Sequence, residues 1–310
     1  MSTFLISGVL KYSQPVLKAA TVEFDTNSTL LMAPSEKGGP ASTTLTIIAQ
    51  EIIVKDHAII TYDFEGLPGI DPTRPAPPQT GTASNGFNGF SPPGEGPYPQ
   101  AANGSDGGPG MPGAKGISGL DAPELEIYVG GIKQSFADAI TVNFKGQDGG
   151  SGGTGGTGGT GGNGQKGAAS QTSDSWYDGD QCDREPGKGG NGGKGGDAGY
   201  PGRGGNGGAG GIISVFTMKA SLPLVQTWNY IVKGGKGAPP GHPGHPGQGG
   251  KGGPQGDQND PCPSRPEYAG SDGPAGQSMN DIDANWSTDY AGADGEDGYY
   301  ATYELTQVPS

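Results

Sequence analysis

Glycine recurs at every third position over long stretches of this chain, and this spacing constrains the fold more than any other feature. One unbroken phase extends from Gly146 to Gly167 and another from Gly187 to Gly211. Flexible linkers have no reason to keep such a phase over about 25 residues. The spacing therefore argues against a linker. Further runs with the same period cover 104–119, 235–256, 270–276 and 292–298.

The run 146–167 differs from collagen because it contains no Pro, and the second position of each triplet is also Gly. Only the third position carries side chains, among them Thr154, Thr157 and Thr160. An extended helix with three residues per turn has no internal hydrogen bonds, so its N–H and C=O groups need outside partners. Two bare glycine edges let neighbouring helices supply them while the polar edge faces water. The pattern favours a polyglycine-II bundle within one chain, with a true triple helix and disorder as the alternatives.

The composition supports a fold held mainly by backbone hydrogen bonds. Of 310 residues, 65 are Gly, 28 are Pro and only 30% are hydrophobic, which is too few for an ordinary core. The net charge of −14 argues against nucleic acid or an anionic membrane as partner. We also expect no membrane insertion, because no run of about 18 apolar residues occurs. The first residues lack the pattern of a signal peptide, so we expect synthesis in a cytoplasm.

Short segments rich in branched and aromatic residues bracket the glycine runs and predict β-strands. We expect an all-β base over 1–64, a short-strand sandwich or solenoid that serves for attachment. The bundle would occupy 65–298 with interleaved strands, and 299–310 would return to the base as a strand. Essentially no α-helix is expected. Three pairs spaced by seven suggest stacked rungs in the base: Leu45/Ile47, Ile52/Val54 and Ile59/Thr61.

This organisation places the irregular segments 65–103, 168–186 and 257–291 at the far end of the bundle. Cys182 and Cys262 lie in two of these segments, so we expect a disulfide between them. The same segments are rich in aromatic residues. Such rings either pack together as a cap or anchor a recognition surface, and the sequence leaves both interpretations open.

The sequence gives little support to metal or catalytic chemistry. His242 and His245 would be about 9 Å apart on an extended helix, too far to chelate one metal ion without another element. The stretch NDIDANW (280–286) begins like a calcium loop but has Trp286 where the turn needs Gly. No arrangement of catalytic side chains is evident. We therefore expect no enzyme activity, no cofactor and no metal.

The in-phase GGT and GGN runs, joined by aromatic-bearing loops, resemble the tip adhesins of the long tail fibres of T-even-like bacteriophages. The resemblance covers about 104–298 and is one of pattern. It implies that the irregular segments form a receptor-binding surface on a virion or another extracellular particle. The best candidates for receptor contact are then Tyr98, Trp176, Tyr177, Tyr268, Trp286 and Tyr290.

Three functions follow as hypotheses. The first is an adhesin whose distal loops bind a cell-surface glycan or protein and whose N-terminal β region attaches to a fibre or particle protein. The second is a structural subunit or cap of an extracellular filament or coat, with self-assembly. The third is ice binding, because glycine-rich antifreeze proteins resemble the bundle and the Thr154/Thr157/Thr160 column offers small side chains.

Overall fold

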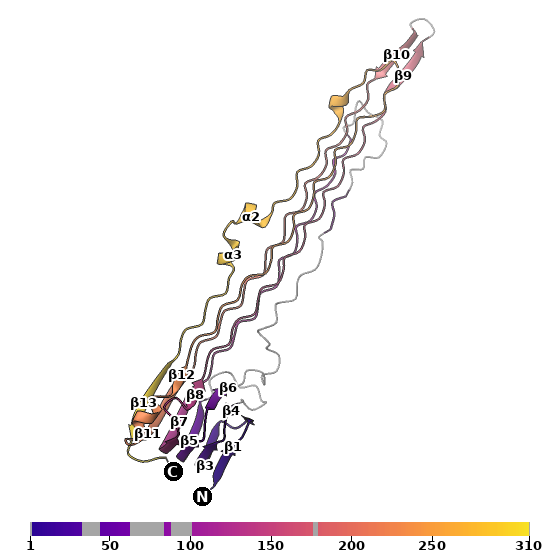
Figure 1. The fold of residues 1–310 in the computed structure, drawn as a ribbon. Coiled ribbons are helices and arrows are strands. Elements are labelled where there is room, and N and C mark those ends of the chain that lie inside the picture. Colours follow the sequence, from indigo (N-terminus) through magenta and orange to yellow (C-terminus); the bar gives the residue numbers. More distant parts are fainter. Residues whose placement is uncertain (1, 33–43, 63–83, 88–100, 176–178, 310) are drawn as a thin grey trace.

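The chain forms a long rod that rises from two β-sheets (Figure 1). The computed structural model describes residues 2–32, 44–62, 84–87, 101–175 and 179–309. The sheets lie at one end, and glycine-rich segments extend from them side by side to a small hairpin at the other end. Both chain termini lie at the sheet end.

All strands within each of the two large sheets are parallel. The six strands of sheet A are, in spatial order, β1 (Thr3–Ile6), β3 (Val16–Phe24), β5 (Leu45–Val54), β7 (Leu125–Gln134), β11 (Ile212–Met218) and β13 (Tyr299–Leu305). The five strands of sheet B are β12 (Asn229–Ile231), β8 (Ile140–Asn143), β6 (Ala58–Tyr62), β4 (Ser28–Met32) and β2 (Val9–Tyr12). From β1 to β8 the chain alternates between the two sheets.

The predicted fold class is wrong. The strands do not form an all-β short-strand sandwich over 1–64 but a mostly parallel, α/β-type fold of two large sheets, with almost no helix. Strands as distant as β13 complete sheet A. Local alternation of side chains reports burial of one face but not strand direction, and parallel strands need long crossover connections. Here the connection between the parallel neighbours β7 and β11 passes through β8 of sheet B and the glycine-rich segments that follow it.

The spacing of seven also has another cause. Leu45, Ile47, Ile52 and Val54 belong to the single ten-residue strand β5, rather than to two stacked rungs. In β6 the inward residues are Ala58 and Ile60, whereas Ile59 is exposed.

The core lies between the two sheets. Inward residues of neighbouring strands pack there, such as Ile47 and Ile127 from sheet A and Ile60 and Val142 from sheet B, all of them fully or almost fully buried. A four-residue helix, α1 (Leu222–Val225), links β11 to β12 and adds Val225 to this core.

The glycine-rich segments continue the sheets as two layers. Runs 1 (101–122), 3 (187–211) and 5 (270–277 and 290–298) lead into β7, β11 and β13 of sheet A, and runs 2 (144–170) and 4 (232–257) leave β8 and β12 of sheet B. Neighbours in a layer are parallel, and the two layers run in opposite directions. Run 3 is central and exchanges backbone hydrogen bonds with all four other runs.

The hydrogen bonds between runs repeat every three residues. In run 3, for example, the N–H groups of Gly190 and Gly193 donate to Gln165 and Gly162 of run 2, at 2.9 and 2.8 Å. The approach is close enough to require glycine: a Cβ on Gly193 would lie 2.0 Å from the carbonyl oxygen of Ser105. The three-residue glycine period thus coincides with the period of contact between runs.

The third, polar column does not simply face water. Its Asp and Asn side chains accept backbone N–H groups of the next run, as Asn163 does from Lys251 and Asp148 does from Lys236, both at 2.8 Å. Asn191 likewise accepts from Ser271, at 3.0 Å. These side chains satisfy donors that the glycine columns leave unpaired.

Candidate functional site

The far end of the rod is a hairpin formed by β9 (Gln171–Ser175) and β10 (Gly179–Arg184), which join run 2 to run 3. The strands are antiparallel, with Cys182 opposite Thr172. Figure 1 shows this hairpin at the end of the rod opposite the two large sheets. Trp176 and Tyr177, between β9 and β10 in the sequence, lie outside the described residues, as does Tyr98, so their predicted roles stay predictions.

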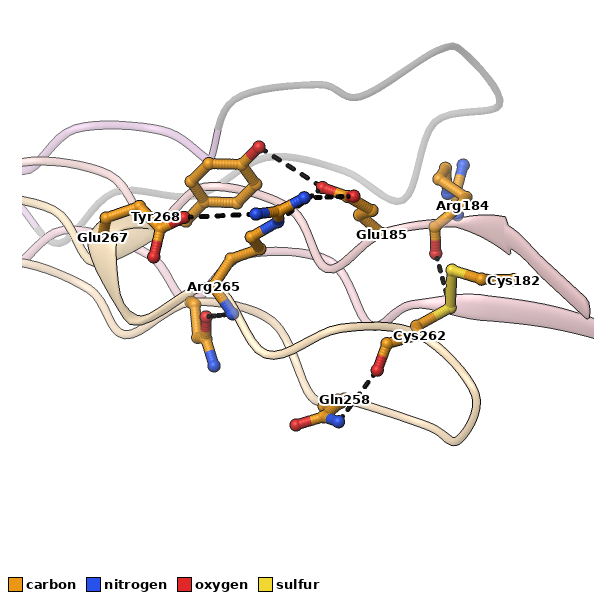
Figure 2. Close-up of polar contacts among 9 residues, drawn as sticks. Cys182, Arg184, Glu185, Gln258, Cys262, Arg265, Glu267 and Tyr268 are labelled. Atoms are coloured by element: carbon orange, nitrogen blue, oxygen red, sulfur yellow. Dashed lines mark hydrogen bonds and ion pairs between the residues drawn. A yellow bond between two sulfur atoms is a disulfide. The ribbon is translucent and has the colours of Figure 1, made fainter.

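The hairpin is tied covalently to the chain that leaves run 4. Cys182 and Cys262 form a disulfide, as expected from the sequence, and Cys262 is buried. Figure 2 shows this bond joining β10 to the segment that follows run 4. The two turns at the end of the rod are therefore one covalently linked unit.

A second contact between the same two segments is ionic. The guanidinium of Arg265 donates to both carboxylate oxygens of Glu185, from Nε at 3.0 Å and from Nη2 at 2.7 Å (Figure 2). The hydroxyl of Tyr268, in the short helix η1 (Pro266–Tyr268), donates to Glu185 at 3.4 Å. The hydrogen bonds from Arg265 lower the pKa of Glu185, with a smaller contribution from Tyr268. We call Glu185, Arg265, Tyr268 and the disulfide the tip clasp.

Tyr268 is the one predicted contact residue that the described structure places in the tip clasp. One face of its ring lies under the ammonium of Lys188, at 5.2 Å from the ring centroid. Its hydroxyl and one ring face therefore have intramolecular partners, while part of the side chain remains accessible. The tip clasp serves to hold the hairpin, and sequence reasoning missed Arg265 and Glu185. Their opposite charges beside the two cysteines were the available indication.

Trp286 and Tyr290 lie elsewhere. Trp286 belongs to a loop, 278–289, that leaves run 5 partway along the rod and contains the short helices α2 (Met279–Ile282) and α3 (Trp286–Asp289). Tyr290 directly follows this loop, where run 5 resumes its bonds to run 3. Figure 1 shows both helices projecting from the side of the bundle, away from the hairpin. The expectation that the whole of 257–291 gathers at the far end is therefore wrong for this part. The cause is that run 5 bonds to run 3 on both sides of the loop.

The rings of this side loop also have internal partners. The indole N–H of Trp286 donates to Asn280 at 2.9 Å, and the guanidinium of Arg203 lies 4.6 Å from the ring centroid of Tyr290. Asp281 accepts from the backbone and hydroxyl of Ser278, so it acts as a helix cap. Trp286 is nevertheless half-exposed and Ile282 is exposed, so the loop offers a second aromatic and apolar surface.

Other groups considered from the sequence stay apart in the structure. His242 and His245 are exposed on run 4. Among the described residues, no three His, Cys, Asp or Glu side chains gather in a way that suits a metal ion. Thr154 and Thr157 are half-buried, and the carbonyl of Thr160 accepts the N–H of Gly86, so a neighbouring segment lies beside this column. None of the helices in the described part of the chain is long and apolar enough to cross a membrane.

Comparisons of the chain with protein-family models, with curated proteins and with solved structures found no match. The functional argument therefore depends on the geometry of the chain itself.

Proposed function

We propose that this protein is a non-enzymatic adhesin that presents the hairpin end of a rigid rod to a cell-surface receptor, a glycan or a protein. The observation that carries the proposal is the tip clasp. A disulfide and a two-pronged Arg–Glu contact fix an exposed hairpin at the end of the rod farthest from the sheets.

The rod supports such a role because it keeps the hairpin at a fixed distance from the base. Its runs are cross-linked by a hydrogen bond at every third residue, so binding costs little ordering of the scaffold. The turn between β9 and β10 carries Trp176 and Tyr177, residue types that dominate recognition surfaces. In this proposal the protein acts outside the cell or on a particle surface, and the β-sheet end attaches it to a fibre or particle protein.

The test is binding of labelled protein to candidate host cells and to an array of surface glycans. We expect Trp176→Ala/Tyr177→Ala to reduce binding at least tenfold, since aromatic anchors carry much of the energy of an interface. The matched control is Tyr200→Ala, which removes an exposed ring from run 3. Binding unchanged by the hairpin variant, or reduced equally by the control, contradicts the proposal.

A structural subunit of an extracellular assembly is the second candidate. The sheet edges at β1, β13, β2 and β12, which pair with no further strand in the described part of the chain, favour it. Ice binding gains no support from the threonine column, because Thr154 and Thr157 are half-buried and Gly86 lies beside Thr160, whose carbonyl accepts its N–H.

A further inference from the structure

The two large sheets end on both sides in edge strands with exposed apolar side chains. Sheet A ends at β1 and β13, and sheet B ends at β2 and β12. At the N-terminal end, Leu5, Val9 and Val16 are 54%, 74% and 45% exposed; at the other end, Tyr299, Tyr300 and Tyr303 are 58%, 53% and 44% exposed. Natural sheets usually protect their edges with charges, Pro or bulges; these edges carry Lys18 and Glu304, but their exposed apolar side chains still indicate pairing surfaces.

The two ends of sheet A have complementary lengths. At one end β1 pairs only with Thr21–Phe24 of β3, and the outer edge of β3 over Val16–Ala19 has no strand beside it in the described chain. We call this edge the notch. The pairings place Val16, Thr46, Glu126, Ser214 and Ala301 in one row across the sheet.

It follows that Ala301–Glu304 of β13 occupy the same four rows as the notch. The four strand positions that are empty beside β3 thus match four residues of the edge strand β13 at the opposite end of sheet A. These four residues of β13 cover the rows that β1 leaves open, whereas Leu305 falls in the row of Ala20, whose N–H already donates to the carbonyl of Ser2.

Sheet B shows the same match without a notch. Val9, Thr29, Ile59, Thr141 and Asn229 form one row, so the edge strands β2 and β12 cover the same rows. Leu10 of β2 and Tyr230 of β12 share the next row, and each is half-buried against its end of the core.

We infer that copies of this chain associate head to tail, with β13 of one copy seated in the notch of the next and β12 paired with β2. A second copy is the partner that brings both edges at once, because its two sheets have the same strand directions and the same separation. The interface joins two different surfaces, so repetition produces an open filament. In the joined sheet A, β13 of one copy and β1 of the next share one strand position beside β3, so each copy adds five strand positions to either sheet. This gives an axial repeat of about 24 Å, with the glycine rods projecting from one side. This inference does not depend on the adhesin proposal.

Specific contacts favour this pairing. Tyr128, Phe216 and Tyr303 stack across sheet A with ring centroids 4.6 and 4.8 Å apart, and Tyr303 ends the stack. In the joined sheet Tyr303 would lie opposite the exposed Lys18 of the next copy, as a cation over an aromatic ring. The tail after β13 leaves this edge open, since Val308 turns back toward Gly130 of β7.

Two features affect the strength of the association between copies. The Val16 carbonyl already accepts from the Tyr12 hydroxyl at 2.9 Å, but a carbonyl oxygen has lone pairs for two donors. Glu304 would lie opposite Ala19, where desolvation of its carboxylate opposes association. Glu304→Gln is therefore expected to strengthen association severalfold.

Sedimentation velocity of the full chain over a range of concentrations tests the inference. We expect the average mass to rise above the 31.0 kDa monomer with concentration. Tyr303→Lys should weaken association about tenfold, because it places like charges opposite each other at Lys18. Adding Lys18→Glu should restore it. Tyr200→Lys, the same change on the bundle, should have no effect, and circular dichroism verifies that each variant is folded.

Mixing two variants distinguishes head-to-tail from two-fold association. Val16→Lys weakens the notch and Tyr303→Lys weakens β13, so each variant alone should associate more weakly than the wild type, while an equal mixture should form dimers through its one intact pair of surfaces. A wild-type chain that stays monomeric at its highest soluble concentration overturns the inference. So does a folded Tyr303→Lys or Val16→Lys variant that assembles alone as well as the wild type. Loss of receptor binding in the adhesin test has no bearing on these outcomes.

Discussion

At the scale of single residues, the positions where another residue replaces glycine in the three-residue repeat show what glycine does in the bundle. Ala198 and Ala238 bond to the two ends of the side loop, at Gln277 and Gly292. Between them, Pro201 of run 3 and Pro240, Pro243 and Pro246 of run 4 take positions where the column is otherwise mostly glycine. A proline has no N–H to donate and its ring needs space. Prolines therefore mark the stretch where run 5 leaves the bundle.

Where runs do touch, a single methyl group is expected to be costly. A Cβ on Gly155 of run 2 would lie 2.2 Å from the carbonyl oxygen of Gly199 in run 3, and backbone has little room to give. We expect Gly155→Ala to lower the free energy of unfolding by about 3 kcal/mol, the upper range for overpacking. Urea denaturation followed by circular dichroism measures this change.

The neighbouring Thr154→Ala serves as the control, because Thr154 belongs to the polar column. It should change the free energy of unfolding by less than about 1 kcal/mol. Equal effects of the two substitutions would contradict the role assigned to the glycine columns.

At the scale of elements, charged side chains fasten run 5 to run 4. Asp272 accepts from Lys251 Nζ at 2.8 Å and from the N–H of Gly252 at 2.9 Å. Asp297 accepts from Lys233 Nζ at 2.6 Å and from the N–H of Gly234 at 2.9 Å. In each case the lysine lowers the carboxyl pKa most and the backbone N–H adds to the effect. The contact of run 5 with run 4, across the two layers, thus depends on ionised aspartates.

This arrangement predicts a loss of stability in acid. The folded pKa values of Asp272 and Asp297 lie below their usual 3.8, so their contribution is fully present above that pH. It is lost as the pH falls through the lowered values. Asp272→Asn/Asp297→Asn keeps the acceptor oxygens but removes the titration and the ion pairs.

Urea midpoints of both proteins between about pH 2 and 6 check this. We expect the variant to be less stable than the wild type at pH 6 and to approach it in acid. A constant difference across the range would show that the two carboxylates do not act through ionisation. High salt should reduce the difference at pH 6, because these groups are exposed.

The sequence allows some of the site to be predicted and hides the rest for physical reasons. The glycine period and the two cysteines are visible directly, because each depends on residue type at a fixed position. The place of Trp286 and Tyr290 was missed, since it depends on which run of glycines bonds to which, and all runs look alike. The prolines of run 4 were the available indication of the side loop, because they replace glycine where run 4 has no contact with run 5.

At the scale of the whole molecule, base and bundle are one structure. Three strands of sheet A, β1, β3 and β5, come before run 1 in the sequence, and the other three, β7, β11 and β13, come after it. The glycine-rich runs form part of the connections between these later parallel strands. Strand direction was missed for this reason: alternation in β3 or β5 is the same for parallel and antiparallel neighbours. The partner strand β7 of β5 is also distant in the sequence, since Leu45 pairs with Leu125.

The same architecture predicts that the N-terminal region does not fold alone. In a fragment of residues 1–64, one edge of β5 loses its neighbour β7, and one edge of β6 loses its neighbour β8. Leu45, Ile47 and Ile60 would then be exposed at an unpaired sheet edge, and parallel sheets need both faces and neighbours covered. We expect this fragment to show little far-ultraviolet signal for strands and poor dispersion of amide protons in NMR, whereas the full chain shows both. A well-dispersed spectrum from the fragment would mean that the base is an independent domain, and that the later strands only extend sheets that are already complete.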